Sequence, residues 1–132
     1  MTTAVDLANE YQYGGSIFPA GDRTSSVNGE GVDFRDCEAA ITVDALYGPV
    51  TPGTTCIITL QESDDDGDAD AYANITGATM ATVSTASANN LTSERLQFQN
   101  RAKRWVRAVA TLTGSSPGIM VTASLTARKV SY

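Results

Sequence analysis

The sequence has 132 residues, a length that suits one domain of ordinary size. Hydrophobic residues make up 42% of it, which is enough for a core, although it has one Trp and three Phe. The formal net charge of −6 argues against nucleic acid as the main partner, because binding phosphates needs a positive surface. No apolar run approaches the roughly 20 residues of a membrane span, and residues 1–10 lack the pattern of a signal peptide. We therefore expect a protein that folds in a cytoplasm and has no membrane partner.

Residues 1–20 show little regular pattern. Tyr11, Tyr13 and Phe18 are spaced among glycines and a proline. This composition is typical of an extended N-terminal arm whose aromatic side chains anchor it to another surface. The alternative is that the segment packs on its own domain. No linker, repeat or low-complexity block divides the rest, so we expect an arm over 1–20 and one β-sandwich domain over 21–132.

The chain beyond this arm alternates hydrophobic and polar residues, which is the period of a half-buried strand. In 37–47, for example, Ala39, Ile41 and Val43 share one face. Comparable segments lie at 32–34, 54–63, 79–86, 93–99, 104–113 and 118–132. Residues 91–99 could alternatively form a short helix. About eight short strands with clear turns favour an all-β fold, an antiparallel, jelly-roll-like β-sandwich.

Glycines and prolines over 48–53 predict a turn that joins 37–47 and 55–63 as a hairpin. In that hairpin Cys37 and Cys56 lie about nine residues apart along the strand direction, roughly 30 Å at 3.3 Å per residue. A disulfide needs Cα atoms within roughly 7 Å. We therefore expect both cysteines to be free, as is usual in a reducing compartment.

The charges gather in two stretches of the sequence. The acidic stretch holds Glu62, Asp64, Asp65, Asp66, Asp68 and Asp70, and the basic stretch holds Arg101, Lys103, Arg104 and Arg107. One interpretation is two solvated loops. The other is a charge-complementary docking surface, with an acidic end and a basic end on the molecule.

Trp105 lies within the basic stretch and alternates out of phase with Val106. We therefore expect it on the outer face of its strand with Arg101, Lys103 and Arg107, with Arg104 on the opposite face. Trp105 either covers a second layer of structure or anchors an interface, since Trp and Arg are enriched at interface hot spots.

The composition offers little for catalysis. There is no histidine, which removes the usual general base, the usual zinc ligand and the Ser-His-Asp arrangement. Two separated cysteines cannot form a structural zinc site. The aspartates over 64–70 have the oxygen-rich composition of a calcium loop, but an EF-hand alignment places the last ligand at Ala73, which has no side-chain oxygen. We expect a protein that is not an enzyme and has no cofactor or metal, with a nonstandard calcium loop as the alternative to a solvated turn.

Two short stretches resemble a known family. Leu60–Gly67 (LQESDDDG) and Lys103–Arg107 (KRWVR), with Asp33-Phe34 before the first main strand, are similar to motifs of small structural proteins of tailed-phage virions. The resemblance covers about residues 30–128. It implies a cement or decoration protein with a jelly-roll fold and no catalytic residue. The chain departs from the family pattern where Asp68–Ala71 precedes Tyr72.

The resemblance implies a capsid cement protein that binds the outer surface of the major capsid shell and bridges its subunits. Its partners would be the major capsid protein and further copies of the chain, as a dimer or trimer. It would be made in the host cytoplasm and reside on the virion surface. The residues predicted to bind partners are Arg101, Lys103, Arg104, Trp105, Arg107, Tyr11, Tyr13 and Phe18. The alternative is a carbohydrate- or receptor-binding module of a phage tail or head fibre, which would need exposed aromatic side chains on one sheet face.

Overall fold

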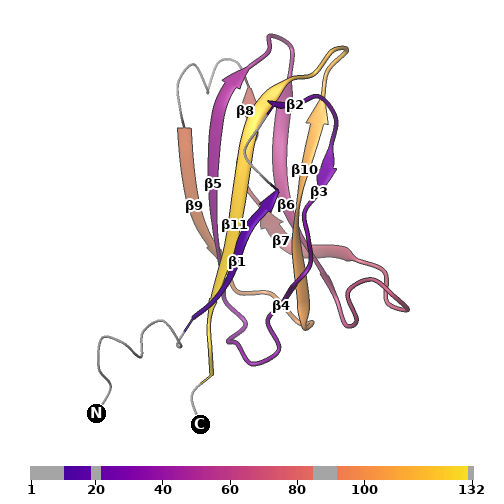
Figure 1. Ribbon diagram of the computed structural model, residues 1–132, viewed down its shortest axis with the longest axis vertical. Helices are drawn as coiled ribbons and strands as arrows, with labels where there is room; N and C mark the ends of the chain where they lie inside the picture. The colour runs from indigo at the N-terminus through magenta and orange to yellow at the C-terminus, as the bar shows by residue number, and fades with distance from the viewer. Residues whose placement is uncertain (1–10, 19–21, 85–91, 131–132) are drawn as a thin grey trace.

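A computed structural model describes residues 11–18, 22–84 and 92–130 of the chain (Figure 1). These ranges contain strands and no helix, and all strand pairs are antiparallel. The strands form two sheets that pack face to face around a shared core. The expected all-β, jelly-roll-like sandwich is confirmed. No helix long and apolar enough to cross a membrane occurs in the described ranges.

The first sheet has the strand order β1-β11-β5-β9, with β2 also paired to β11. Its strands are β1 (Tyr11–Phe18), β2 (Asp22–Arg23), β5 (Ile41–Val50), β9 (Thr92–Phe98) and β11 (Ile119–Arg128). β11 therefore lies in the middle of this sheet, between β1 and β5 (Figure 1). The segment 92–98 is a strand, so the alternative of a short helix at 91–99 is wrong over those residues.

The second sheet has the order β3-β10-β6-β7, with β4 paired to β10 and β8 paired to β6. Its strands are β3 (Val27–Asn28), β4 (Val32–Asp33), β6 (Thr55–Ser63), β7 (Ala73–Thr79), β8 (Val83–Ser84) and β10 (Trp105–Thr113). β6 and β10 pair along their whole lengths, from Trp105 opposite Ser63 to Thr113 opposite Thr55.

The core is built from alternate residues of the long strands, as the period-two pattern predicts. β10 and β11 alternate along their whole lengths between buried and more exposed positions, and β6 does so as far as Gln61. The largest fully buried side chains include Tyr47 and Phe34. Ala39 is exposed, and the strand expected from residue 37 begins at Ile41 instead, because the chain before it forms a turn that contacts Lys129 through Cys37.

The predicted hairpin of 37–47 and 55–63 is wrong. β5 pairs with β9 and β11, whereas β6 pairs with β7, β8 and β10, so the connection at 51–54 crosses from one sheet to the other. The β10–β11 connection crosses at the same end of the sandwich (Figure 1). The two connections bind each other, because the Thr51 amide donates to the Gly118 carbonyl at 2.8 Å and the Gly118 amide donates to the Thr54 hydroxyl at 2.9 Å.

Both cysteines are free, as expected, although the hairpin behind that expectation is wrong. Cys37 pairs with Lys129 in an isolated bridge, and Cys56 pairs with Leu112 near the crossing connections. The two thiols therefore belong to different parts of the sandwich.

The segment at 11–18, for which the sequence predicts no regular pattern, forms β1. Its backbone pairs with β11 from Tyr11 opposite Arg128 to Phe18 opposite Ala123, with two irregularities in register. Residues 1–10 and 19–21 lie outside the described residues. The division into an arm over 1–20 and a domain over 21–132 stays a prediction, and so does the anchoring role of Tyr11, Tyr13 and Phe18.

Candidate functional site: a charge-paired end and an adjoining groove

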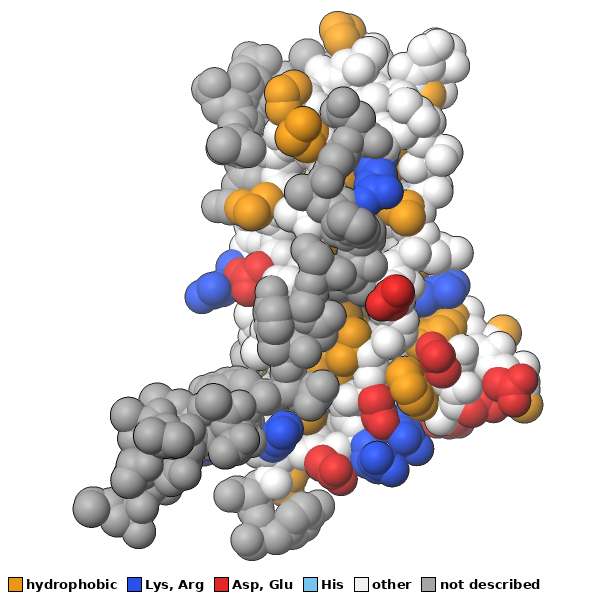
Figure 2. All heavy atoms as spheres, viewed as in Figure 1, with side chains coloured by type: hydrophobic (Ala, Val, Ile, Leu, Met, Phe, Trp, Pro, Cys, Tyr) orange, Lys and Arg blue, Asp and Glu red, His pale blue; other side chains and the backbone are white. Residues whose placement is uncertain are grey.

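The acidic and basic stretches lie against each other at one end of the sandwich, and charged side chains of both signs gather there in Figure 2. The Asp70 carboxylate accepts a hydrogen bond from the Lys103 ammonium at 2.7 Å. Glu62 accepts from the backbone amides of Ala102 and Lys103 at 2.8 and 3.1 Å. The expectation of separate acidic and basic ends is wrong, because antiparallel pairing places the end of β6 beside the start of β10.

Arg104 is held by Asp33 on the neighbouring strand β4. Its Nε and Nη2 atoms donate to the two carboxylate oxygens at 2.8 and 2.6 Å. This bidentate bond holds the pKa of Asp33 below its ordinary value. The Arg104 guanidinium also lies 5.5 Å from the centre of the Trp105 ring. Arg104 is therefore not on the face opposite Trp105, because residues 103–104 form a bend before β10 in which strand alternation does not apply.

Arg101 turns toward the end of the core instead of the outer face. Its guanidinium donates to the carbonyls of Lys103, Cys37 and Glu38 at 2.9, 3.0 and 2.6 Å. It also lies 5.9 Å from the centre of the buried Phe34 ring. Burial lowers the pKa of Arg101 from its ordinary value. Arg101 thus joins two chain segments of its own fold, and the expectation that it shares a face with Trp105 is wrong.

Trp105 and Arg107 do share the outer face of the second sheet, as the alternation predicts. Both are half-buried, while Val106 and Ala108 between and beyond them are fully buried. The pairing of β10 with β6 gives each of them a neighbour on this face: Gln61 lies opposite Arg107, and Ser63 lies opposite Trp105. Of the basic residues in the stretch, Arg107 is the one that lines a groove on this face.

The acidic loop after β6 is organised by its own hydrogen bonds. Asp65 accepts from the amides of Ala69 and Asp70 at 2.8 and 3.1 Å, and these bonds lower the pKa of Asp65. The buried Ser63 hydroxyl donates to the Asp70 carbonyl at 2.6 Å and accepts from the Gly67 amide at 2.8 Å. In the described part of the chain, no group of three or more His, Cys, Asp or Glu side chains is placed to hold a metal ion.

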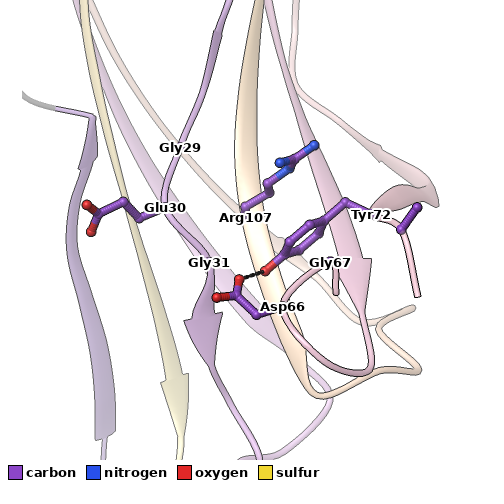
Figure 3. A pocket seen from close by; sticks show the side chains of 8 residues that line it. Gly29, Glu30, Gly31, Asp66, Gly67, Tyr72 and Arg107 are labelled. Atoms are coloured by element: carbon purple, nitrogen blue, oxygen red, sulfur yellow. Dashed lines mark hydrogen bonds between the residues drawn. The ribbon is translucent and has the colours of Figure 1, made fainter. Parts of the chain in front are cut away.

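A groove of about 690 Å³ opens where this loop meets β10 and the connection between β3 and β4 (Figure 3). Its lining consists of Gly29, Glu30, Gly31, Asp66, Gly67, Ala71, Tyr72 and Arg107, and we call it the Tyr72 groove. The phenol of Tyr72 donates to the Asp66 carboxylate at 2.7 Å. Burial and this hydrogen bond raise the pKa of Tyr72 above its ordinary value.

The Arg107 guanidinium forms one wall of the Tyr72 groove. It lies 4.3 Å from the centre of the Tyr72 ring, a cation–π distance. Its Nε and Nη2 atoms donate to the Gln61 amide oxygen at 2.9 and 2.7 Å. Sequence reasoning missed this groove, because its walls come from three segments far apart in the chain. The paired glycines around Glu30 are the signal that could have pointed to it, since closely spaced glycines accompany close backbone packing.

Comparison with known proteins found no matching family model and no matching curated protein. Among solved structures, the chain is similar to one from infectious bursal disease virus strain Gx, with a TM-score of 0.61 and 8% identity. That match covers 90% of this chain and 32% of the viral one, so the chain spans about a third of its length. Two carbohydrate-binding modules are similar at lower scores. They are a family 22 module of Clostridium thermocellum Xyn10B (TM-score 0.46, 13% identity, 93% and 88% covered) and a family 16 module (0.43, 13%, 79% and 71%). At these identities the likeness concerns the fold alone, and the chain is classed as a jelly-roll-like β-sandwich module.

Proposed function

We propose that this chain is a capsid cement protein of a tailed phage, which binds the outer surface of the major capsid shell and bridges its subunits. The observation that supports this most directly is that the two stretches carrying the family resemblance form one unit. Residues 60–67 and 103–107 are joined by the pairing of β6 with β10 and by the bonds of Glu62 to the amides of Ala102 and Lys103. Motifs that meet in space can serve a single binding surface.

The same unit supports a binding role because of the side chains it leaves on the outer face. Lys103 and Arg104 are already paired with carboxylates of their own chain. Trp105 and Arg107 remain half-exposed beside them, and these two residue types dominate interface hot spots. We infer that Trp105 is the main anchor on the capsid protein. The ion pairs would hold the anchor in place, so shell binding should depend only weakly on salt.

The further parts of the proposal follow from the family resemblance. The protein would act without catalysis, which fits a sequence without histidine. Its partners would be the major capsid protein and other copies of the chain, with no role for nucleic acid. It would be made in the host cytoplasm and reside on the outside of the virion.

The test is co-sedimentation of the purified chain with shells of the phage that encodes it. Trp105→Ala should raise the dissociation constant about 30-fold, since a buried aromatic anchor contributes about 2 kcal/mol. The matched control is Arg95→Gln, which removes a charge from an exposed ion pair with Asp44 on the other sheet and should bind normally. Shells that bind the Trp105 variant at wild-type affinity would show that the anchor lies elsewhere. Wild-type chain that does not sediment with shells would contradict the function itself.

A further inference from the structure

We propose that the Tyr72 groove is a binding site for a neutral saccharide. The inference does not depend on the proposed capsid role, because the proposed capsid anchor, Trp105, does not line the groove; Arg107 is the one side chain that the two surfaces share. The groove combines an acceptor, Asp66, at the Tyr72 hydroxyl with a donor, Arg107, over the Tyr72 ring. Ligand sites are concave surfaces in which a few polar groups converge, and this groove has that form.

The acceptor side of the groove is held in place by backbone packing. Asp66 has a φ of 60°, a left-handed conformation that Asp adopts more readily than most residues other than glycine, and its carboxylate bonds the Tyr72 hydroxyl. Gly31 packs so closely that a Cβ atom added there would collide with both the Tyr72 hydroxyl and the Asp66 carboxylate. The hydrogen bond between Tyr72 and Asp66 is therefore fixed before any ligand arrives.

The donor side is held without being neutralised. Arg107 is bound by the neutral amide of Gln61 and by the Tyr72 ring. It forms no ion pair with a carboxylate in the described ranges. Asp66 uses one carboxylate oxygen for Tyr72, and its other oxygen has no hydrogen-bond partner among the described residues. Arg107 and Asp66 thus line one groove, and each can still form a further hydrogen bond to a ligand.

This combination favours a neutral ligand that can both donate and accept. An anion at Arg107 would meet the Asp66 carboxylate, and a cation at Asp66 would meet the guanidinium. Sugar hydroxyl groups both donate and accept, so one neutral sugar offers partners for Asp66 and for Arg107. In Figure 3 the Glu30 carboxylate points away from Tyr72, which leaves Asp66 as the acidic side chain near the phenol.

The shape of the groove leads us to expect weak binding. The Tyr72 ring has Arg107 over one face and Gly67 against it, so a sugar ring cannot stack on it freely. Recognition then rests on a few hydrogen bonds in an open groove, for which we expect dissociation constants on the order of 1 mM. From the sequence, a carbohydrate-binding module is expected to use exposed aromatic side chains on one sheet face. The site proposed here is instead a polar groove.

The experiment is a titration of the full-length ¹⁵N-labelled chain followed by amide chemical shifts. The neutral probes are glucose, galactose, N-acetylglucosamine and cellobiose, and the charged probes are glucuronate and glucosamine. At least one neutral sugar should shift the amides of Gly31 and Gly67 at millimolar concentration. Asp66→Asn keeps a residue that tolerates the left-handed conformation, and Arg107→Gln replaces the guanidinium by a shorter, uncharged amide. Each should raise the dissociation constant at least about tenfold, while Arg95→Gln on the other sheet should not change it.

The spectra of the variants also show whether the fold is intact, so lost binding and lost structure are told apart. Shifts that appear at the groove with neutral sugars and disappear in both groove variants support the proposal. Three outcomes overturn it: no groove shifts at tens of millimolar neutral sugar, shifts that persist in both groove variants, or tighter binding of glucuronate or glucosamine than of every neutral probe.

Discussion

The Lys103 ammonium lies 2.7 Å from the Asp70 carboxylate, which joins the start of β10 to the loop after β6. Asp70 also accepts from the Asp64 amide at 2.8 Å, so its carboxylate closes the acidic loop on itself. Two stretches of opposite charge in the sequence thus form an internal contact of the fold. In the folded chain this contact holds the loop against β10.

Asp70 and Lys103 should contribute unequally to stability. Asp70→Asn weakens both the bond from Lys103 and the bond from the Asp64 amide, whereas Lys103→Gln affects only the first. We expect a lower urea midpoint for Asp70→Asn than for Lys103→Gln, with the difference between Lys103→Gln and wild type shrinking at high salt. The double variant should resemble Asp70→Asn alone. Equal, additive losses from the two single changes would contradict this arrangement.

The protein should lose stability in acid. Hydrogen bonds from Arg104, from the Ala69 amide and from Lys103 lower the pKa values of Asp33, Asp65 and Asp70, respectively. A carboxyl whose pKa is lower in the folded state stabilises the fold above its unfolded pKa and stops doing so as pH falls through the folded pKa. The urea midpoint, followed by Trp105 fluorescence, should therefore be flat from pH 7 to about 5 and fall below about pH 4. Asp65→Asn should make that fall shallower, and a midpoint that rises in acid would refute the assignment.

Glycine at position 114 should matter more than glycine at position 53. Both have positive φ, 135° and 85°. A Cβ at Gly114 would lie 2.8 Å from the Gly53 carbonyl oxygen, whereas one at Gly53 meets nothing within 4 Å. Gly53→Ala should lower the free energy of unfolding by about 1 kcal/mol through backbone strain alone, and Gly114→Ala by about 3 kcal/mol because a clash with backbone is added. Chemical denaturation measures both, and a reversed order would count against the packed crossing connections.

The two thiols should react at different rates in the native protein. Cys56 is fully buried, and burial raises its pKa to about 11, so little thiolate forms at neutral pH. Cys37 is half-exposed, although burial also raises its pKa. Intact-mass analysis with iodoacetamide should show one adduct under native conditions and two in urea, without any reductant. Cys37→Ser should remove the native adduct, whereas equally fast labelling of both thiols would contradict the burial of Cys56.

The alternation of side chains predicts which faces are buried much better than it predicts which strands pair. Ile58 and Ala108 are in the core, as a period of two requires. The same pattern carries no information about which sheet a strand joins. A short connection rich in glycine and proline suits a hairpin and a crossing between sheets equally well, and at 51–54 the chain uses it for the crossing.

The candidate site was harder to predict because its contacts join distant residues. Sequence alone indicates that Trp105 and Arg107 share a face, since that depends on local alternation. It does not indicate that Asp33 binds Arg104 or that Tyr72 packs under Arg107, because those contacts depend on the pairing of β4 and β6 with β10. Knowledge of the strand order would have been sufficient to place Lys103 near the acidic loop.

The position of β11 has a consequence for how the chain folds during synthesis. This strand spans residues 119–128 and yet lies in the middle of its sheet, so β1 and β5 cannot be joined before it has left the ribosome. β10 joins β3 and β4 to β6 in the same way in the second sheet. Pairings between strands so distant in the chain form slowly, and until they form the edges of β5 and β6 are open to other chains. Truncation within residues 105–128 should therefore yield aggregated protein instead of a smaller folded core.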